Sequence, residues 1–281
     1  MTQKAYNDFI QRFMLLIRKH PELITTTLSN IFTMRIIGNK THGDLAEIAI
    51  AEFINQYMYD FHSTHVGKDL YRAKSREEDI VIKNEISNME FPVSLKAYGD
   101  GPLQLSTDKN YKMYPLLDKH GSEIVSPKTI ESIFMSSAFS NFDAINILPL
   151  IYDEKRERCN ILVFNSGLAK ASTKQIRKEK SGKGRKHPVY KFFDSEDNYI
   201  CEVRYGDAMA NALQRGLWTH TKNALSYFTS VTNGWIDYSR NLVLVKLFSH
   251  ALVSSVAGHK NALRAIKKDI LKLKNKNNIN V

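Results

Sequence analysis

Apolar residues recur at the spacing of a helix near the beginning of the chain. Between residues 6 and 34 they fall three or four positions apart, which places them on one helix face. Pro21 interrupts this pattern, and because proline lacks a backbone N–H, it predicts a break between two helices. A polar start signal at residues 41–44 precedes a third apolar face that extends to about Met58. We therefore expect helices up to this point, with residues 1–42 acting as a support.

The hydrophobic period then changes to one typical of strands. Residues 79–82 and 91–98 are β-branched or aromatic runs separated by a polar stretch, which predicts a β-hairpin. Further strands are expected at residues 144–152, 160–164, 189–193 and 199–205, and further helices at residues 129–139, 208–226, 242–256 and 260–274. The order of these elements predicts an α/β (α+β) fold, a single domain in which a central mixed β-sheet is flanked by helices.

Composition and charge narrow the class of protein. With 43% apolar and 25% charged residues, the 281-residue chain is neither disordered nor a fibre or coiled-coil rod. Its 40 Lys and Arg against 29 Asp and Glu give a net charge of +11, which favours a polyanionic partner such as nucleic acid. The two cysteines make no disulfide framework, and no uncharged apolar stretch is long enough to span a membrane. We therefore expect a cytoplasmic protein without membrane contact.

Polar residues on the predicted hairpin and on the helix before it suggest metal-assisted chemistry. Asp79 begins one strand, Ser94 and Lys96 lie on the next, and Glu47 lies on the helix. Mg²⁺ binds a few carboxylate or carbonyl oxygens, so Asp79, the Leu95 carbonyl and Glu47 are candidate metal ligands. An ammonium group beside such a site orients the attacking water and neutralises charge on a phosphate, which is the chemistry of phosphodiester hydrolysis.

This order of residues resembles the PD-(D/E)XK nuclease superfamily, and type II restriction endonucleases in particular, over about residues 43–108. The resemblance implies a restriction-endonuclease-like fold, in which Asp79 and a second acid hold Mg²⁺, Lys96 assists the water and Glu47 completes the site. The sequence differs from the family in two places, because Glu78 stands where proline is usual and Ser94 where the second acid is usual. A Ser-x-Lys variant occurs in such enzymes, with the missing acid supplied from elsewhere. The candidates for that acid are Glu47, Glu78 and Asp108, and Gln104 is a further candidate near the metal.

A structural interpretation of the same residues stands beside the catalytic one. Asp79 would then cap the start of its strand, and Lys96 would be an edge lysine whose stem lies along apolar surface. The place of Lys96 between Leu95 and Ala97 argues against this, since a charge in an apolar run needs a carboxylate or a metal site nearby.

Two segments are candidates for contact with DNA. Residues 170–186 are predicted to form a loop that is mobile until phosphates order it, since its eight cations face one acid. The cations are Lys170, Lys174, Arg177, Lys178, Lys180, Lys183, Arg185 and Lys186. A helix predicted from residue 208 presents Asn211, Gln214 and Arg215, which are residue types that read base edges or bind phosphates. A solvated basic loop and an exposed polar helix face are the structural alternatives.

Together with the resemblance, these residues predict a Mg²⁺-dependent, site-specific endonuclease of a type II restriction-modification system. Residues 43–108 would carry the catalytic helix and hairpin, 109–240 the rest of the sheet with the DNA-binding loop and helix, and 241–281 basic helices. Double-stranded DNA would be the substrate, a homodimer the active form, and a DNA methyltransferase the functional partner. A non-catalytic nucleic-acid-binding protein and a structure-specific repair nuclease of the same superfamily remain the alternatives.

Overall fold

The computed structural model describes most of the chain up to residue 244. The described residues are 2–33, 42–65, 79–99, 101–140, 142–143, 145–180, 186–239, 241–242, 244, 264, 267–269 and 271–272. The helices predicted at residues 242–256 and 260–274 therefore lie mostly outside them. Within the described part, no helix has both the length and the apolar composition needed to cross a membrane.

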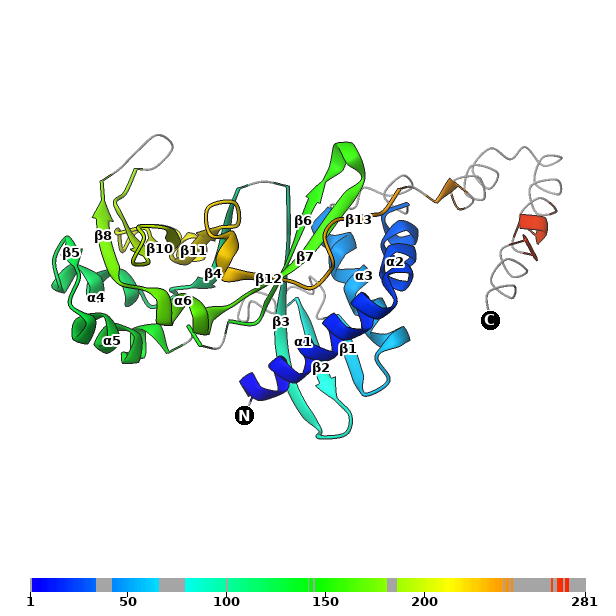
Figure 1. Ribbon diagram of the computed structural model, residues 1–281, viewed down its shortest axis with the longest axis horizontal. Coiled ribbons are helices and arrows are strands. Elements are labelled where there is room, and N and C mark those ends of the chain that lie inside the picture. The colour runs from blue at the N-terminus through cyan, green and yellow to red at the C-terminus, as the bar shows by residue number, and fades with distance from the viewer. Residues whose placement is uncertain are drawn as a thin grey trace.

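The N-terminal helices form as the apolar period predicts. α1 (Thr2–Lys19) and α2 (Pro21–Thr33) are separated at His20, and Pro21 is the first residue of α2, where its missing N–H costs no helical hydrogen bond. α3 (His42–Tyr57) follows. Figure 1 shows these three helices together on one side of the strands that come next.

The predicted hairpin is confirmed and belongs to a seven-stranded mixed sheet with the order β1-β2-β3-β6-β7-β12, in which β13 also pairs with β7. Its strands are β1 (Phe61–His65), β2 (Ile80–Asn84), β3 (Met89–Tyr98), β6 (Ile147–Asp153), β7 (Arg158–Phe164), β12 (Phe228–Ser230) and β13 (Ile236–Asp237). β3 and β6 run parallel, whereas the other pairs are antiparallel. This is the mixed central sheet with flanking helices that the sequence predicts.

A second sheet was not expected. It has six strands in the order β4-β11-β10-β9-β8-β5, and all neighbours are antiparallel. The strands are β4 (Pro102–Thr107), β5 (Glu123–Ile124), β8 (Gln175–Glu179), β9 (Val189–Phe193), β10 (Tyr199–Arg204) and β11 (Gly216–His220). With α4 (Met113–Lys119), α5 (Pro127–Met135) and α6 (Ser166–Ser172) they form the second lobe seen in Figure 1. Residues 109–240 therefore complete the first sheet only in part.

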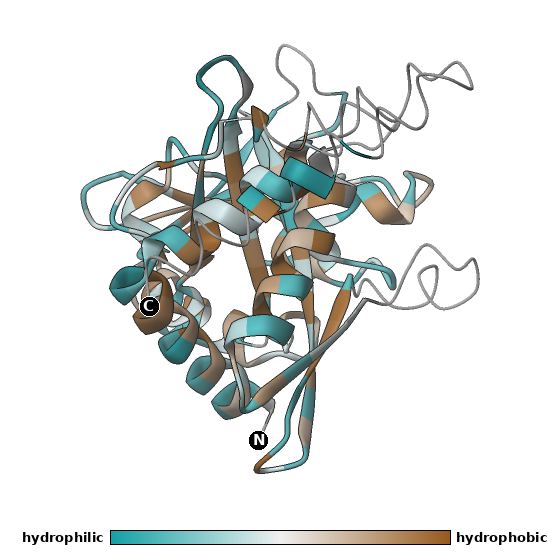
Figure 2. Cartoon of the chain, turned by 90° about the vertical axis from the view of Figure 1, so that its right-hand side faces the viewer, coloured by the Kyte–Doolittle hydropathy of each residue, from teal (hydrophilic) through white to brown (hydrophobic). Residues whose placement is uncertain are grey.

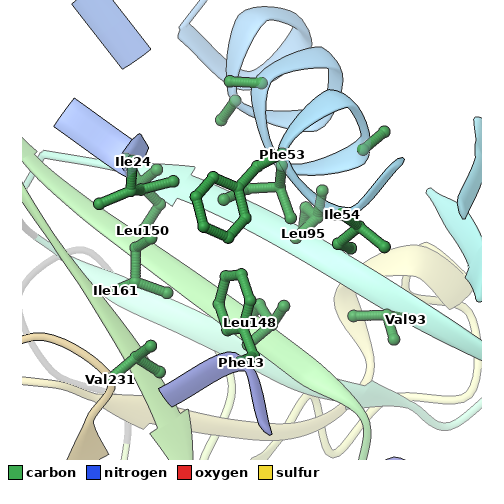
Figure 3. Close-up of a cluster of buried hydrophobic side chains, with 14 of the residues drawn as sticks. Phe13, Ile24, Phe53, Ile54, Val93, Leu95, Leu148, Leu150, Ile161 and Val231 are labelled. Carbon is green, nitrogen blue, oxygen red and sulfur yellow. The ribbon is translucent and has the colours of Figure 1, made fainter. Parts of the chain in front are cut away.

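Each sheet has its own apolar core. The first core lies between the mixed sheet and α1–α3, where Phe13 and Phe53 pack edge to face with ring centroids 5.6 Å apart (Figure 3). The second core is built from α4, α5 and the six-stranded sheet, with Tyr190 and Phe192 fully buried. Hydrophobic residues follow the interior strands in Figure 2, while hydrophilic ones predominate on outer turns. Burial of large aromatic side chains makes each core a strong contributor to stability.

Candidate functional site

Three neighbouring residues of the hairpin converge on one carboxylate oxygen. Asp79 stands just before β2, and the pairing of Ile80 with Val93 puts it opposite Ser94 on β3. Asp79 Oδ2 accepts hydrogen bonds from Ser94 Oγ at 2.8 Å and from the Leu95 backbone N–H at 2.6 Å. Lys96 Nζ lies 3.8 Å from the same oxygen. The carboxylate is thus held by two donors, with an ammonium group beside it.

The strand period places this group on the face of the sheet away from the helices. Side chains alternate along β3, so Ser94 and Lys96 share one face, while Val93 and Leu95 are buried on the other in the first core. The Lys96 side chain retains 38% of its exposure and that of Asp79 retains 24%. Lys96 has the nearby carboxylate that a charge in an apolar run was expected to need, while Leu95 and Ala97 point to the opposite face. Both charged groups are therefore partly exposed to solvent.

The other acids proposed for the site are placed unequally. Glu47 is half-buried on α3, where it already interacts with another residue. Glu78 lies outside the described residues. Asp108 is buried, and its two oxygens accept the backbone N–H groups of Lys112 and Met113 at 2.9 and 2.8 Å. It therefore caps the start of α4 and is not free to replace the acid missing at position 94.

Gln104 is also drawn away from the hairpin. It lies on β4 in the second sheet, where its Nε2 donates to the Arg215 carbonyl at 3.1 Å. Its position in the sequence after Lys96 did not predict this, because the chain changes from the first sheet to the second between β3 and β4.

The described residues supply only part of a Mg²⁺ site. The contacts of Asp79 with Ser94, Leu95 and Lys96 use Oδ2, and the Leu95 carbonyl is an oxygen of the kind that Mg²⁺ binds. Among the described residues, however, no group of three or more His, Cys, Asp or Glu side chains is placed to hold a metal ion. Within the described part of the chain, Asp79 is thus the carboxylate that the hairpin supplies to such a site, with the Leu95 carbonyl as a neighbouring oxygen ligand.

The described first part of the basic segment, residues 170–180, lies on α6 and β8, so in this part the prediction of a loop is wrong. Lys170 ends α6, and Arg177 and Lys178 lie on β8. Their charges face carboxylates, with N–O distances of 2.9 Å for Lys170 and Asp143, 2.6 Å for Arg177 and Asp197, and 2.6 Å for Lys178 and Asp118. Hydrogen bonds from Lys178 and then Tyr190 lower the pKa of Asp118 below its usual value. The three aspartates lie outside residues 170–186, so the charge balance of that segment alone did not include them.

The remaining cations of that segment divide into two groups. Lys174, Lys180 and Lys186 are exposed, and Lys174 donates to the Ala171 carbonyl at 3.2 Å. Lys183 and Arg185 lie outside the described residues.

The predicted base-reading helix at residues 208–226 does not form. A 3₁₀ turn, η4 (Ala212–Gln214), leads into β11 and then into a second 3₁₀ turn, η5 (Leu225–Tyr227). Arg215 is buried at 9% exposure, donates to the Ala208 carbonyl at 3.1 Å and lies over the Tyr111 ring. In this position the Arg215 side chain packs within the second lobe. Asn211 and Gln214 remain exposed, although the Asn211 side-chain oxygen accepts the Leu213 N–H.

The structure also shows a cavity of about 370 Å³ in the second lobe that the sequence did not indicate. Lys186, Asn211 and Gln214, which were candidates for DNA contact, line it together with His187, Arg204 and Tyr205. The last three lie before β9 and at the end of β10, and their residue types at those positions gave no signal in the sequence.

Comparison with known proteins adds no assignment, since no family model, no curated protein and no solved structure matches this chain.

Proposed function

We propose that this protein is a Mg²⁺-dependent, site-specific endonuclease of double-stranded DNA, similar to type II restriction endonucleases. The observation that carries the proposal is the convergence of Ser94, Leu95 and Lys96 on the carboxylate of Asp79 at the end of a hairpin. A homodimer would cut both strands of a two-fold symmetric site, and a DNA methyltransferase of the same specificity would protect the host DNA.

The chemistry of these residues suits phosphodiester hydrolysis. Lys96 presents a half-exposed ammonium group whose charge offsets the charge that builds on a phosphate during attack. Ser94 and the Leu95 N–H fix the direction of the Asp79 carboxylate through Oδ2, and Oδ1 makes no hydrogen bond to the described residues. Mg²⁺, once bound with further help from Glu47 or Glu78, would supply a Lewis acid at the same place.

The charge of the chain also supports a nucleic-acid substrate. A net charge of +11 attracts a polyanion from a distance, and the exposed lysines named above add local attraction.

One observation favours a second candidate, a nucleic-acid-binding protein without catalysis. The described residues contain no group of three metal-binding side chains, and such a protein needs none. It would use the same charge, and Lys96 would pair with Asp79 for structural reasons only. A structure-specific repair nuclease of the same superfamily would keep the site and differ in its products.

The test is incubation of the protein with unmethylated phage DNA of known sequence, in Mg²⁺ and in EDTA. Lys96→Ala removes the ammonium group at the site, and Lys83→Ala is the matched control, because Lys83 lies on the neighbouring strand of the same hairpin. We expect discrete fragments with the wild type and Lys83→Ala in Mg²⁺, and intact DNA with Lys96→Ala and in EDTA.

Other outcomes select the alternatives. DNA that is retarded but uncut in every lane would support the binding protein. If the wild type produced a smear of fragments and Lys96→Ala left the DNA intact, the protein would be a nuclease that recognises DNA structure and not sequence. Undiminished cleavage by Lys96→Ala would remove Lys96 from the site.

A further inference from the structure

The cavity in the second lobe has the dimensions and lining of a small-ligand site. Its volume of about 370 Å³ falls at the lower end of the range for such pockets, and residues of β9, β10 and the turn before β11 line it. The six polar or aromatic residues that line it are Lys186, His187, Arg204, Tyr205, Asn211 and Gln214. Two cations, two amides and two rings that could form stacking surfaces are thus gathered in one place.

Arg204 is held in position by the surrounding fold. Its Nε bonds the buried carboxylate of Glu202, and its guanidinium lies 4.6 Å from the centroid of the Trp218 ring. Among the described residues, neither Nη1 nor Nη2 of Arg204 makes a hydrogen bond. A guanidinium fixed at one edge offers its two remaining amino groups as a rigid pair of donors, which matches a partner with two adjacent acceptors.

The aromatic wall of the cavity includes a residue in an uncommon backbone conformation. Tyr205 has a φ of +62°, a left-handed conformation that bulky residues rarely adopt. Its ring lies 6.3 Å from that of His187, at 49° to it. Asparagine or glycine at this position would relieve the backbone strain. The chain has tyrosine instead, which places an aromatic ring at the cavity. Such rings are stacking surfaces for nucleobases.

We propose that this cavity binds the base of a single unstacked nucleotide and prefers guanine. The base would stack on Tyr205, and its O6 and N7 would accept the two free amino groups of Arg204. Lys186 would attract the adjoining phosphate, and the amides of Asn211 and Gln214 would contact the remaining base edges. Adenine is disfavoured, because it presents a donor where guanine presents O6. The inference rests on the proposed DNA substrate and adds a base-specific contact far in sequence from the hairpin.

The test uses Trp218 as a reporter, since it contacts Arg204 and its Nε1 donates to the Gln214 carbonyl. Trp235 is the other tryptophan of the chain, so Trp235→Phe leaves Trp218 as the single source of tryptophan fluorescence. The full-length protein is titrated in EDTA with single-stranded pentanucleotides TTNTT, in which N is G, A, C or T. We expect the dissociation constant for TTGTT to be about tenfold lower than for the other three.

Variants assign that preference to the cavity. Tyr205→Asn removes the ring but suits the left-handed backbone, and it should weaken binding of TTGTT about 5- to 150-fold. Arg204→Lys keeps the charge beside Glu202 but loses the paired donors, and it should reduce the preference for guanine to about twofold or less. Lys128→Ala, an exposed lysine on α5 outside the cavity, is the control for loss of one charge and should leave all four constants unchanged.

Equal binding of the four pentanucleotides would overturn the proposal, and so would a guanine preference that survives both variants of the cavity. Guanine preference without cleavage of phage DNA would uphold the cavity and reject the endonuclease. Cleavage of phage DNA, with no change in Trp218 fluorescence on addition of any pentanucleotide, would support the endonuclease and reject the cavity as a base-binding site.

Discussion

The substitution Asp79→Asn distinguishes the contribution of Asp79 to stability from its contribution to DNA cleavage. Asp79→Asn keeps the shape of the side chain and an oxygen that can accept the Ser94 hydroxyl and the Leu95 N–H. It removes the negative charge that faces Lys96 and that any cation at this place would need.

The magnitude follows from the contacts. Each of the two hydrogen bonds changes from one with a charged acceptor to one with a neutral acceptor, a loss of about 1 kcal/mol per bond. The ion pair with Lys96 is substantially exposed and has a long N–O distance of 3.8 Å, so screening reduces its contribution to a few tenths of a kcal/mol. We expect the free energy of unfolding to fall by about 2 kcal/mol, which lowers Tm by about 4–8 °C and leaves the protein folded.

The assay combines thermal unfolding, followed by circular dichroism, with the phage DNA digest. Asp153→Asn is the matched control, because Asp153 ends β6 of the same sheet and pairs with Arg158 at 3.3 Å. We expect both variants to lose similar stability, and only Asp79→Asn to lose cleavage. The reasoning is refuted if folded Asp79→Asn cuts DNA at the wild-type rate. Complete unfolding of Asp79→Asn would instead show that this carboxylate mainly supports the hairpin.

Two further predictions concern backbone and thiols. Gly216→Ala should lower the free energy of unfolding by about 3 kcal/mol or more, measured in urea, because Gly216 has a φ of +124° and a Cβ there would lie 2.2 Å from the Ser106 carbonyl oxygen. Gly167→Ala on α6, where the nearest atom is 3.7 Å away, is the control and should be neutral or slightly stabilising, so equal losses would contradict the argument. Burial raises the pKa of Cys159 to about 12 and that of Cys201 well above its usual value, so neither thiol should react with iodoacetamide between pH 7 and 9 in the native protein, while both should react in urea. The raised pKa values mean that the thiols stay neutral in the folded protein but ionise in the unfolded chain. The free energy of unfolding should therefore fall as the pH rises above about 8.5. Alkylation of the native protein by iodoacetamide would contradict the prediction, because it would show that the core opens.

Much of the candidate site was predictable from local patterns. The break at Pro21, the helix before the hairpin and the hairpin itself follow from hydrophobic periods and from the chemistry of proline, which act over a few residues. The proximity of Asp79 to Ser94 and Lys96 follows in turn from antiparallel pairing across a short polar turn. These predictions used only residues up to the end of the hairpin at Tyr98.

Contacts between distant segments set the limits of that prediction. Arg177 and Lys178 looked like free phosphate-binding cations, yet Asp197 and Asp118 neutralise them from other elements. The apolar residues at positions 213 and 217 suited a helix, but pairing of β11 with β4 and β10 made residues 216–220 a strand. Such pairing depends on which segments meet in space, and local propensity yields to it.

The sequence by itself thus determined the N-terminal helices, the hairpin and the basic character of the protein, because each depends on neighbouring residues or on composition alone. The tertiary structure decided that the strands divide between two sheets, that Lys96 lies on the open face away from Leu95, that Asp108 and Arg215 serve the fold, and that Arg204 and Tyr205 line one cavity. These outcomes depend on the register and packing of segments far apart in the chain, which local periodicity does not encode.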